Sequence, residues 1–209
     1  KYWAFSAPLQ ARHKPLPELK EELLALLDEA VRLRMIADVP LGAFLSGGVD
    51  SSAIVAMMAR YSSGRVKTFC IGFDEASYDE RAYARTVAER YDADHHEMVV
   101  RPKAAAILPL LTWHYNEPFA DPSAIPTYYV AQMARQYVTV VLNGDGGDES
   151  FLGYSRYSQC LETEWINGLP LPLRQLASRL AQSIPPDLDR YRVLRVARRW
   201  LSYVSEKSS

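Results

Sequence analysis

Short apolar runs and segments with helical spacing take turns along the chain. The apolar runs predict strands at residues 41–45, 66–73 and 138–142, and a further strand is expected at residues 95–100, after the turn at residues 92–94. Helices are expected at residues 16–37, 53–60, 77–91, 102–113 and 123–136. Ser77 and Glu80 have capping-box spacing at the start of the third helix. Strands and helices that alternate in order favour a parallel sheet covered on both faces, so the fold class we expect is α/β with a doubly wound parallel sheet.

The sequence pattern changes near the end of the chain. From residue 161 onward, prolines punctuate helical segments, and the last segment, residues 188–204, is amphipathic and rich in arginine. Its spacing favours a solvated helix with one buried face over an RNA site. We expect residues 1–160 to form the core domain and residues 161–209 to begin a helical subdomain.

A polar loop follows the first predicted strand and precedes a helix. Its sequence at residues 46–52 is Ser-Gly-Gly-Val-Asp-Ser-Ser. Free N–H groups and the helix dipole favour an anion there, and Gly47 and Gly48 let the backbone approach it closely. Hydroxyl groups add donors, and Asp50 has the chemistry either to cap the helix or to hold a cation. The loop lacks the Lys of a Walker A motif, and an ordinary strand–turn–helix with a Ser/Asp cap is the alternative.

A second polar loop follows the last predicted strand. Residues 144–149 are Gly-Asp-Gly-Gly-Asp-Glu, and we expect them at the same edge of the sheet as the first loop. Carboxylates that face a polyphosphate need Mg²⁺ between the two groups. The alternatives are a surface turn or a Ca²⁺ loop, although the spacing does not fit an EF-hand.

The two loops together resemble a known family. The Ser-Gly-Gly-x-Asp-Ser pattern resembles the pyrophosphate loop of the N-type ATP pyrophosphatases. The chain as a whole resembles the synthetase domain of the glutamine-dependent asparagine synthetases. The segments that carry this resemblance are residues 38–52, 67–73, 78–80, 95–97, 117–126, 144–149 and 153–154.

The resemblance implies a fold of the adenine-nucleotide α-hydrolase type and an amide-forming reaction. ATP binds over the first loop, and the aspartate side chain attacks its α-phosphate to give an acyl-AMP and pyrophosphate. Ammonia from glutamine then displaces AMP. Oriented N–H groups and Mg²⁺ offset the repulsion between the carboxylate and the phosphate. An N-terminal glutaminase domain is expected in the full-length protein, and a homodimer is a further possibility.

The resemblance also assigns roles to individual residues. Asp145 matches an acidic position that faces the reacting centre, and Asp50 and Asp148 match residues associated with Mg²⁺. The positions that match ATP or pyrophosphate contacts are Phe44, Ser46, Gly47, Gly48, Asp50, Ser51, Ser52, Ile71, Asn143 and Gly144. From their loop position, Glu117 and Asp121 are candidates to reach the amino-acid substrate.

Some positions depart from the family pattern. Many asparagine synthetases have Ser in place of Asn143, Glu in place of Asp145, and an apolar residue in place of Ser150. A catalytic Lys that the family carries further along has no assignable match before residue 209. Because the chain begins at Lys1 and ends in a polar segment, we expect it to be a piece of a longer enzyme.

Charge and composition argue against some classes of binding partner. The net charge of −1 and the lack of a long apolar run argue against nucleic acid and membrane partners. The two cysteines have no CxxC spacing and fit a reducing, cytoplasmic compartment. His95 and His96 point to opposite faces of a strand, which disfavours a shared metal. Two other hypotheses stay open: an acyl-adenylating amidotransferase for another carboxylate, such as a saccharide or peptide, and a non-catalytic nucleotide-binding module.

Overall fold

The protein is described here from a computed structural model. The structure describes residues 14–75, 79–101, 104–163, 170, 172–173, 176 and 179. It divides into two units, residues 1–145 and 146–209, which are treated separately. The helix expected at residues 188–204 lies outside the described residues, and so does most of the expected helical subdomain.

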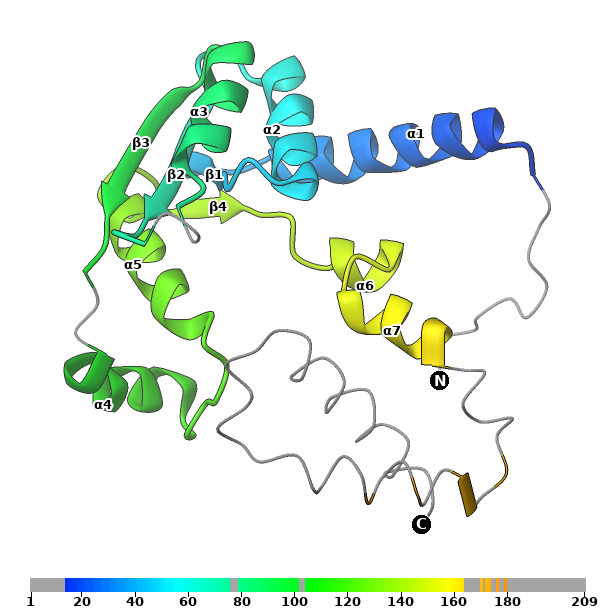
Figure 1. Ribbon diagram of the computed structural model, residues 1–209. Helices are drawn as coiled ribbons and strands as arrows, with labels where there is room; N and C mark the ends of the chain where they lie inside the picture. The colour runs from blue at the N-terminus through cyan, green and yellow to red at the C-terminus, as the bar shows by residue number, and fades with distance from the viewer. Residues whose placement is uncertain are drawn as a thin grey trace, which may run out of the picture. The chain divides into compact units, whose positions relative to one another are not determined.

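The first unit is built on a four-stranded parallel sheet (Figure 1). Its strands are β1 (Leu41–Phe44), β2 (Lys67–Gly72), β3 (Asp94–Val99) and β4 (Val140–Leu142), in the order β3-β2-β1-β4. Strand β1 pairs with β2 on one side and with β4 on the other. The chain therefore reverses its direction of winding at β1, and the carboxyl ends of β1 and β4 form a topological switch point. The predicted α/β class with a doubly wound parallel sheet is confirmed.

Helices cover both faces of this sheet (Figure 1). On one face, α1 (Leu16–Arg34), α2 (Val49–Tyr61) and α3 (Arg81–Arg90) share a core with side chains such as Leu45 and Cys70. On the other face, α5 (Ala124–Ala134) packs against Phe69 and its neighbours. Helix α4 (Ala104–Tyr115) packs on α5 in a third cluster. Alternate residues of β1 and β2 thus enter different cores, as expected for strands buried on both faces.

Two helices begin at residues other than those expected. Helix α2 begins at Val49 rather than at residue 53, so Asp50 and the two following serines lie in its first turn. Its N-cap is Gly48, without a capping side chain, so the Asp50 carboxylate does not cap it. Helix α3 begins at Arg81 with Glu80 as its N-cap, and therefore the capping box predicted from Ser77 is wrong. In both cases backbone geometry set by tertiary packing overrides the local side-chain signal.

The second unit begins with two short helices, α6 (Gly147–Phe151) and α7 (Ser155–Thr163). The stretch expected to be a polar loop therefore becomes helical at Gly147, which puts Asp148 and Glu149 in the first turn of α6. Among the helices in the described part of the chain, none is long and apolar enough to cross a membrane.

Candidate functional site

The first loop joins β1 to α2 and is closed by its own hydrogen bonds. The Gly48 N–H donates to Ser46 Oγ at 3.2 Å, and the Ser51 hydroxyl donates to the Gly48 carbonyl at 3.3 Å. The hydroxyls of Ser46 and Ser51 lie 3.0 Å apart. These contacts fix a turn at the amino end of a 13-residue helix, where the helix dipole favours negative charge.

One hydroxyl in this turn has no partner within the described residues. Ser52 Oγ is buried and makes no hydrogen bond there. A buried polar atom without a partner carries a free-energy cost, and such atoms often mark a place where a ligand binds. The orphaned hydroxyl and the amino end of α2 are together suited to hold an anion.

Gly47 brings the loop against helix α3. Its φ angle is +82°, a conformation that L side chains rarely adopt. A Cβ atom there would lie 2.5 Å from the carbonyl carbon of Tyr83 and 2.6 Å from the Ala84 nitrogen. The backbone of α3 therefore contacts the loop directly, with no room for a side chain between them.

The second loop meets the first at Gly144. A Cβ atom on Gly144 would lie 2.8 Å from Asp50 Cβ and 2.9 Å from the Ser51 nitrogen. The residues that end β4 and the residues that begin α2 thus touch through backbone. This contact brings together two of the segments that the sequence assigned to one site.

Asp145 is held by a neighbour in its own loop. Asn143 Nδ2 donates to Asp145 Oδ2 at 2.7 Å, and the Asp145 N–H lies 3.4 Å from Asn143 Oδ1. Both residues are exposed. The departure from the family pattern at Asn143 therefore supplies a donor that orients the carboxylate two residues later.

A cavity of about 160 Å³ lies beyond the carboxyl ends of β1 and β2. The sequence assigned three of its lining residues, Phe44, Ser46 and Ile71, to nucleotide contacts. The other lining residues are Leu45, Phe69, Cys70, Glu80, Pro126, Thr127 and Val130. The mostly apolar lining suits a flat heterocyclic ring. The wall from α5 was not assigned from the sequence, although the matched segment ends at Pro126.

Cys70 lines this cavity, and its thiol has low reactivity. Burial, followed by the nearby carboxylates of Glu80 and Glu97, raises the pKa of the Cys70 thiol to about 12. The thiol is therefore protonated at neutral pH and is a poor nucleophile. Its side chain belongs to the buried core, with an exposure of 4%.

Two other candidate acids, Glu117 and Asp121, lie between α4 and α5. Both are exposed, and neither lines the cavity. The Asp121 carboxylate accepts a hydrogen bond from the Ser123 backbone N–H at 2.8 Å, at the start of α5. This contact lowers the pKa of Asp121, and it uses the carboxylate to hold the backbone at the start of α5.

In the second unit, the acidic residues of α6 make contacts of their own. Tyr154 donates a hydrogen bond to Glu149 Oε1 at 2.7 Å, which raises the pKa of the Tyr154 hydroxyl to about 12. The carbonyl of Asp148 accepts a hydrogen bond from Gly153 at 3.0 Å. Within the ranges that the structure describes, no group of three or more His, Cys, Asp or Glu side chains is placed to hold a metal ion.

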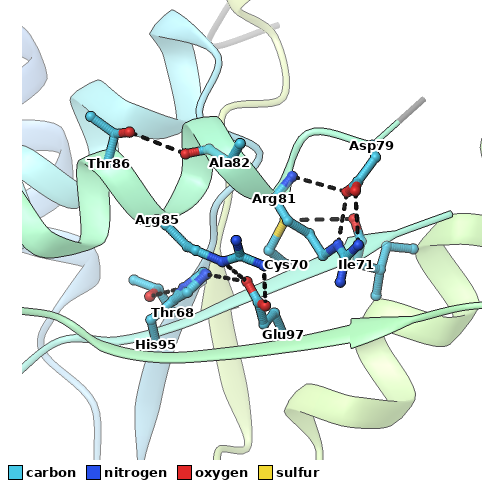
Figure 2. Close-up of polar contacts among 10 residues, drawn as sticks. All are labelled: Thr68, Cys70, Ile71, Asp79, Arg81, Ala82, Arg85, Thr86, His95 and Glu97. Carbon is cyan, nitrogen blue, oxygen red and sulfur yellow. Dashed lines mark hydrogen bonds and ion pairs between the residues drawn. The ribbon is translucent and has the colours of Figure 1, made fainter. Parts of the chain in front are cut away.

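The two histidines of β3 face opposite sides of the sheet, as predicted. His95 lies toward α3, with Nδ1 2.9 Å from Thr68 Oγ1, and burial lowers its pKa (Figure 2). His96 stacks on Phe69 and Tyr137 on the other face. The two rings cannot ligate one ion.

Comparison with known proteins places the chain in a family. The family model described as asparagine synthase matches residues 22–208. A protein of Methanocaldococcus jannaschii, provisionally named asparagine synthetase 2 (glutamine-hydrolysing), is 42% identical over 86% of this chain and 35% of its own length. Asparagine synthetase 1 (glutamine-hydrolysing) of Bacillus subtilis is 34% identical over 87% of this chain and 29% of its own length.

A relative with a different name also matches. The amidase chyE of Penicillium rubens is 30% identical over 97% of this chain and 31% of its own length. The chain therefore spans about a third of the length of these curated relatives.

Proposed function

The chain belongs to the asparagine synthase family, and from this membership we propose that it is the ATP-binding, carboxylate-activating part of a glutamine-dependent asparagine synthetase. The observation that carries the proposal is the meeting of two loops at the sheet's switch point, beside an apolar cavity. Gly144 lies against Asp50 and Ser51, and the cavity begins at Ser46. This is the position where open parallel sheets bind nucleotides.

Different parts of the proposed site bind different parts of the nucleotide. The adenine ring occupies the cavity between Phe44 and Ile71, where apolar contact removes it from water. The leaving pyrophosphate lies over the first loop, within reach of backbone N–H groups and of the orphaned Ser52 hydroxyl. Because the loop is already closed by internal hydrogen bonds, little reorganisation is needed when the charge moves onto the leaving group.

Mg²⁺ is the metal that suits this donor set. The half-buried Asp50 carboxylate stands in the first turn of α2, next to the proposed phosphate site. Asp148 is assigned to the metal from the sequence resemblance alone. When bound, Mg²⁺ would neutralise phosphate charge and leave the α-phosphorus open to attack. A site with few protein carboxylates is usual for Mg²⁺, since phosphate and water oxygens supply the other ligands.

The proposed reaction is the formation of an amide in two steps. The side-chain carboxylate of aspartate attacks the α-phosphorus of ATP, the bond to the bridging oxygen breaks, and pyrophosphate leaves. Ammonia from glutamine then attacks the acyl carbon and AMP leaves. Asp145, whose carboxylate is oriented by Asn143, is proposed to face the reacting centre. The glutaminase step belongs to a part of the full-length protein beyond this chain.

A second candidate is a related ligase that activates a different carboxylate. Two observations support this candidate. One relative is named amidase chyE, and Asp145 is shorter by one methylene than the Glu that many asparagine synthetases have at this position. The loops described above recognise ATP rather than the acid, so they do not separate the two substrates. Pyrophosphate release from the full-length protein that depends on aspartate would support the first candidate.

The proposal is tested by titration calorimetry of the full-length protein with ATP, with and without Mg²⁺. We expect Mg²⁺-dependent binding that Asp50→Ala weakens by about tenfold or more, or about 1.4 kcal/mol. Glu29→Ala, which removes an exposed carboxylate from the middle of α1, is the matched control and should bind as the wild type does. A folded wild-type protein that does not bind ATP would refute the proposal.

A further inference from the structure

The position of the first loop depends on helix α3. The backbone of Tyr83 and Ala84 lies so close to Gly47 that a single added carbon would be 2.5–2.6 Å from it. Any displacement of the first turn of α3 is therefore transmitted to the loop that presents N–H groups to the phosphates. What holds α3 in place accordingly determines the geometry of the loop.

Helix α3 has little apolar surface with which to hold its position. The fully buried residues of this ten-residue helix are Ala84 and Ala88, and Val87 packs against the same core while only partly buried. By contrast, α2 buries Val55, Met57 and Met58. Small side chains let α3 approach the sheet closely, but they give few interlocking contacts to fix its place along the sheet.

Ion pairs supply the restraint that apolar packing does not. Arg85 of α3 reaches Glu97 of β3 with both arms of its guanidinium, at 2.8 Å and 2.6 Å (Figure 2). This bidentate geometry fixes direction as well as distance. The Glu97 carboxylate also lies 3.8 Å from His95 Nε2, and His95 is held by Thr68 of β2. At 3.8 Å the contact between His95 and Glu97 is not a hydrogen bond, so the restraint on α3 comes from the pair between Arg85 and Glu97 of β3.

We propose that Arg85 and Glu97 are positioning residues that hold α3, and through it the first loop, in the geometry that binds the phosphates of ATP. Neither residue lines the nucleotide cavity. The pair acts on the loop through Tyr83, Ala84 and Gly47. The inference rests on the proposed function, because it assigns the loop to pyrophosphate.

The test compares ligands that engage different parts of the site in the full-length protein. Arg85→Gln should weaken MgATP and magnesium pyrophosphate by about fivefold, a size typical of losing one partly exposed ion pair. Adenosine, which fills the cavity but carries no phosphate, should bind the variant and the wild type equally. The exchanged pair Arg85→Glu with Glu97→Arg should recover most of the phosphate affinity. Equal losses for adenosine and MgATP, or no loss for either, would overturn the inference.

A ligand-free measurement separates this inference from the proposed function. Arg85→Gln should raise amide hydrogen exchange at Gly47 and Gly48, since their contact with α3 is loosened. The matched control is Arg60→Gln, which removes the pair between Arg60 and Asp28 that joins α2 to α1 at 2.7 Å. Exchange at the loop that rises equally in both variants would refute a specific role for Arg85. If ATP does not bind the wild type but the exchange result holds, the proposed function fails while the structural coupling stands.

Discussion

The two loops that end β1 and β4 are built in different ways. The first loop is closed by hydrogen bonds among Ser46, Gly48 and Ser51, and it lies directly beneath α3. The second loop is exposed at Asn143 and Asp145, and those two residues bond to each other. Gly144 of this loop approaches the first loop closely, at Asp50 and Ser51.

This difference fits the two roles proposed for the loops, binding the leaving pyrophosphate and acting at the reacting centre. Donors that stabilise a leaving pyrophosphate work best when they are already oriented, which requires a rigid loop supported by its surroundings. A carboxylate that acts at the reacting centre has to stay accessible to a substrate, so one local hydrogen bond is enough to orient it. We therefore expect changes at the contact between the first loop and α3 to affect folding strongly as well as binding, and changes in the second loop to affect folding less.

The largest effect is expected for Gly47→Ala. The substitution forces a side chain into a positive φ of +82° and against the backbone of α3. A left-handed residue costs about 1–2 kcal/mol and overpacking about 1–3 kcal/mol, so the free energy of unfolding should fall by about 2–5 kcal/mol. Urea unfolding followed by circular dichroism measures this change.

Gly64→Ala is the matched control for that substitution. A Cβ atom at Gly64 would meet nothing within 4 Å, and its φ is not positive. The control should leave stability unchanged or raise it by about 0.4–1 kcal/mol. Similar losses in both variants would show that the tight contact between Gly47 and α3 is not present in solution.

A smaller effect on folding, but a clear one on binding, is expected for Gly144→Ala. The added carbon would lie 2.8 Å from Asp50 Cβ and 2.9 Å from the Ser51 nitrogen, but the φ of Gly144 is not positive, so the backbone dihedral adds no strain of its own. We expect the free energy of unfolding to fall by about 1–2 kcal/mol and MgATP to bind about tenfold more weakly. Unchanged MgATP affinity, measured by calorimetry, would show that the two loops do not form one site.

Much of the fold could be predicted from the pattern of apolar positions. The four strands described in the first unit lie within the expected ranges or one residue from them. Strands β1 and β2 are buried and form compact apolar runs, whereas the polar β3 (DHHEMV) is only partly buried. The starts of α2 and α3 were misplaced because their caps are Gly48 and Glu80, which carry no capping hydrogen bond that a side-chain signal could reveal.

The site was predictable only where it is local in sequence. Ser46, Gly47 and Gly144 belong to compact motifs, and the structure places them around one point. Thr127 of α5 and Tyr83 of α3 reach the same region through tertiary packing, although each lies just beyond a matched segment, which ends at Pro126 and at Glu80 respectively. Pairs such as Arg85 and Glu97 depend on the register of a helix against a strand, which apolar periodicity does not determine.

The smallest effect concerns pH and the support of α3 under the first loop. Hydrogen bonds from Arg81 lower the pKa of Asp79, just before α3, to about 2. Because this folded-state pKa lies below the unfolded value of about 3.9, the ionised carboxylate stabilises the fold above that pH. The contribution is lost as the pH falls through about 2. Urea titrations of the wild type and Asp79→Asn should therefore differ slightly at pH 6 and converge toward pH 2.

In the same variant, amide exchange at pH 6 should rise at Gly47, which contacts α3, and not at Gly144. A rise at both glycines would mean that the two loops share one support, contrary to the difference argued here.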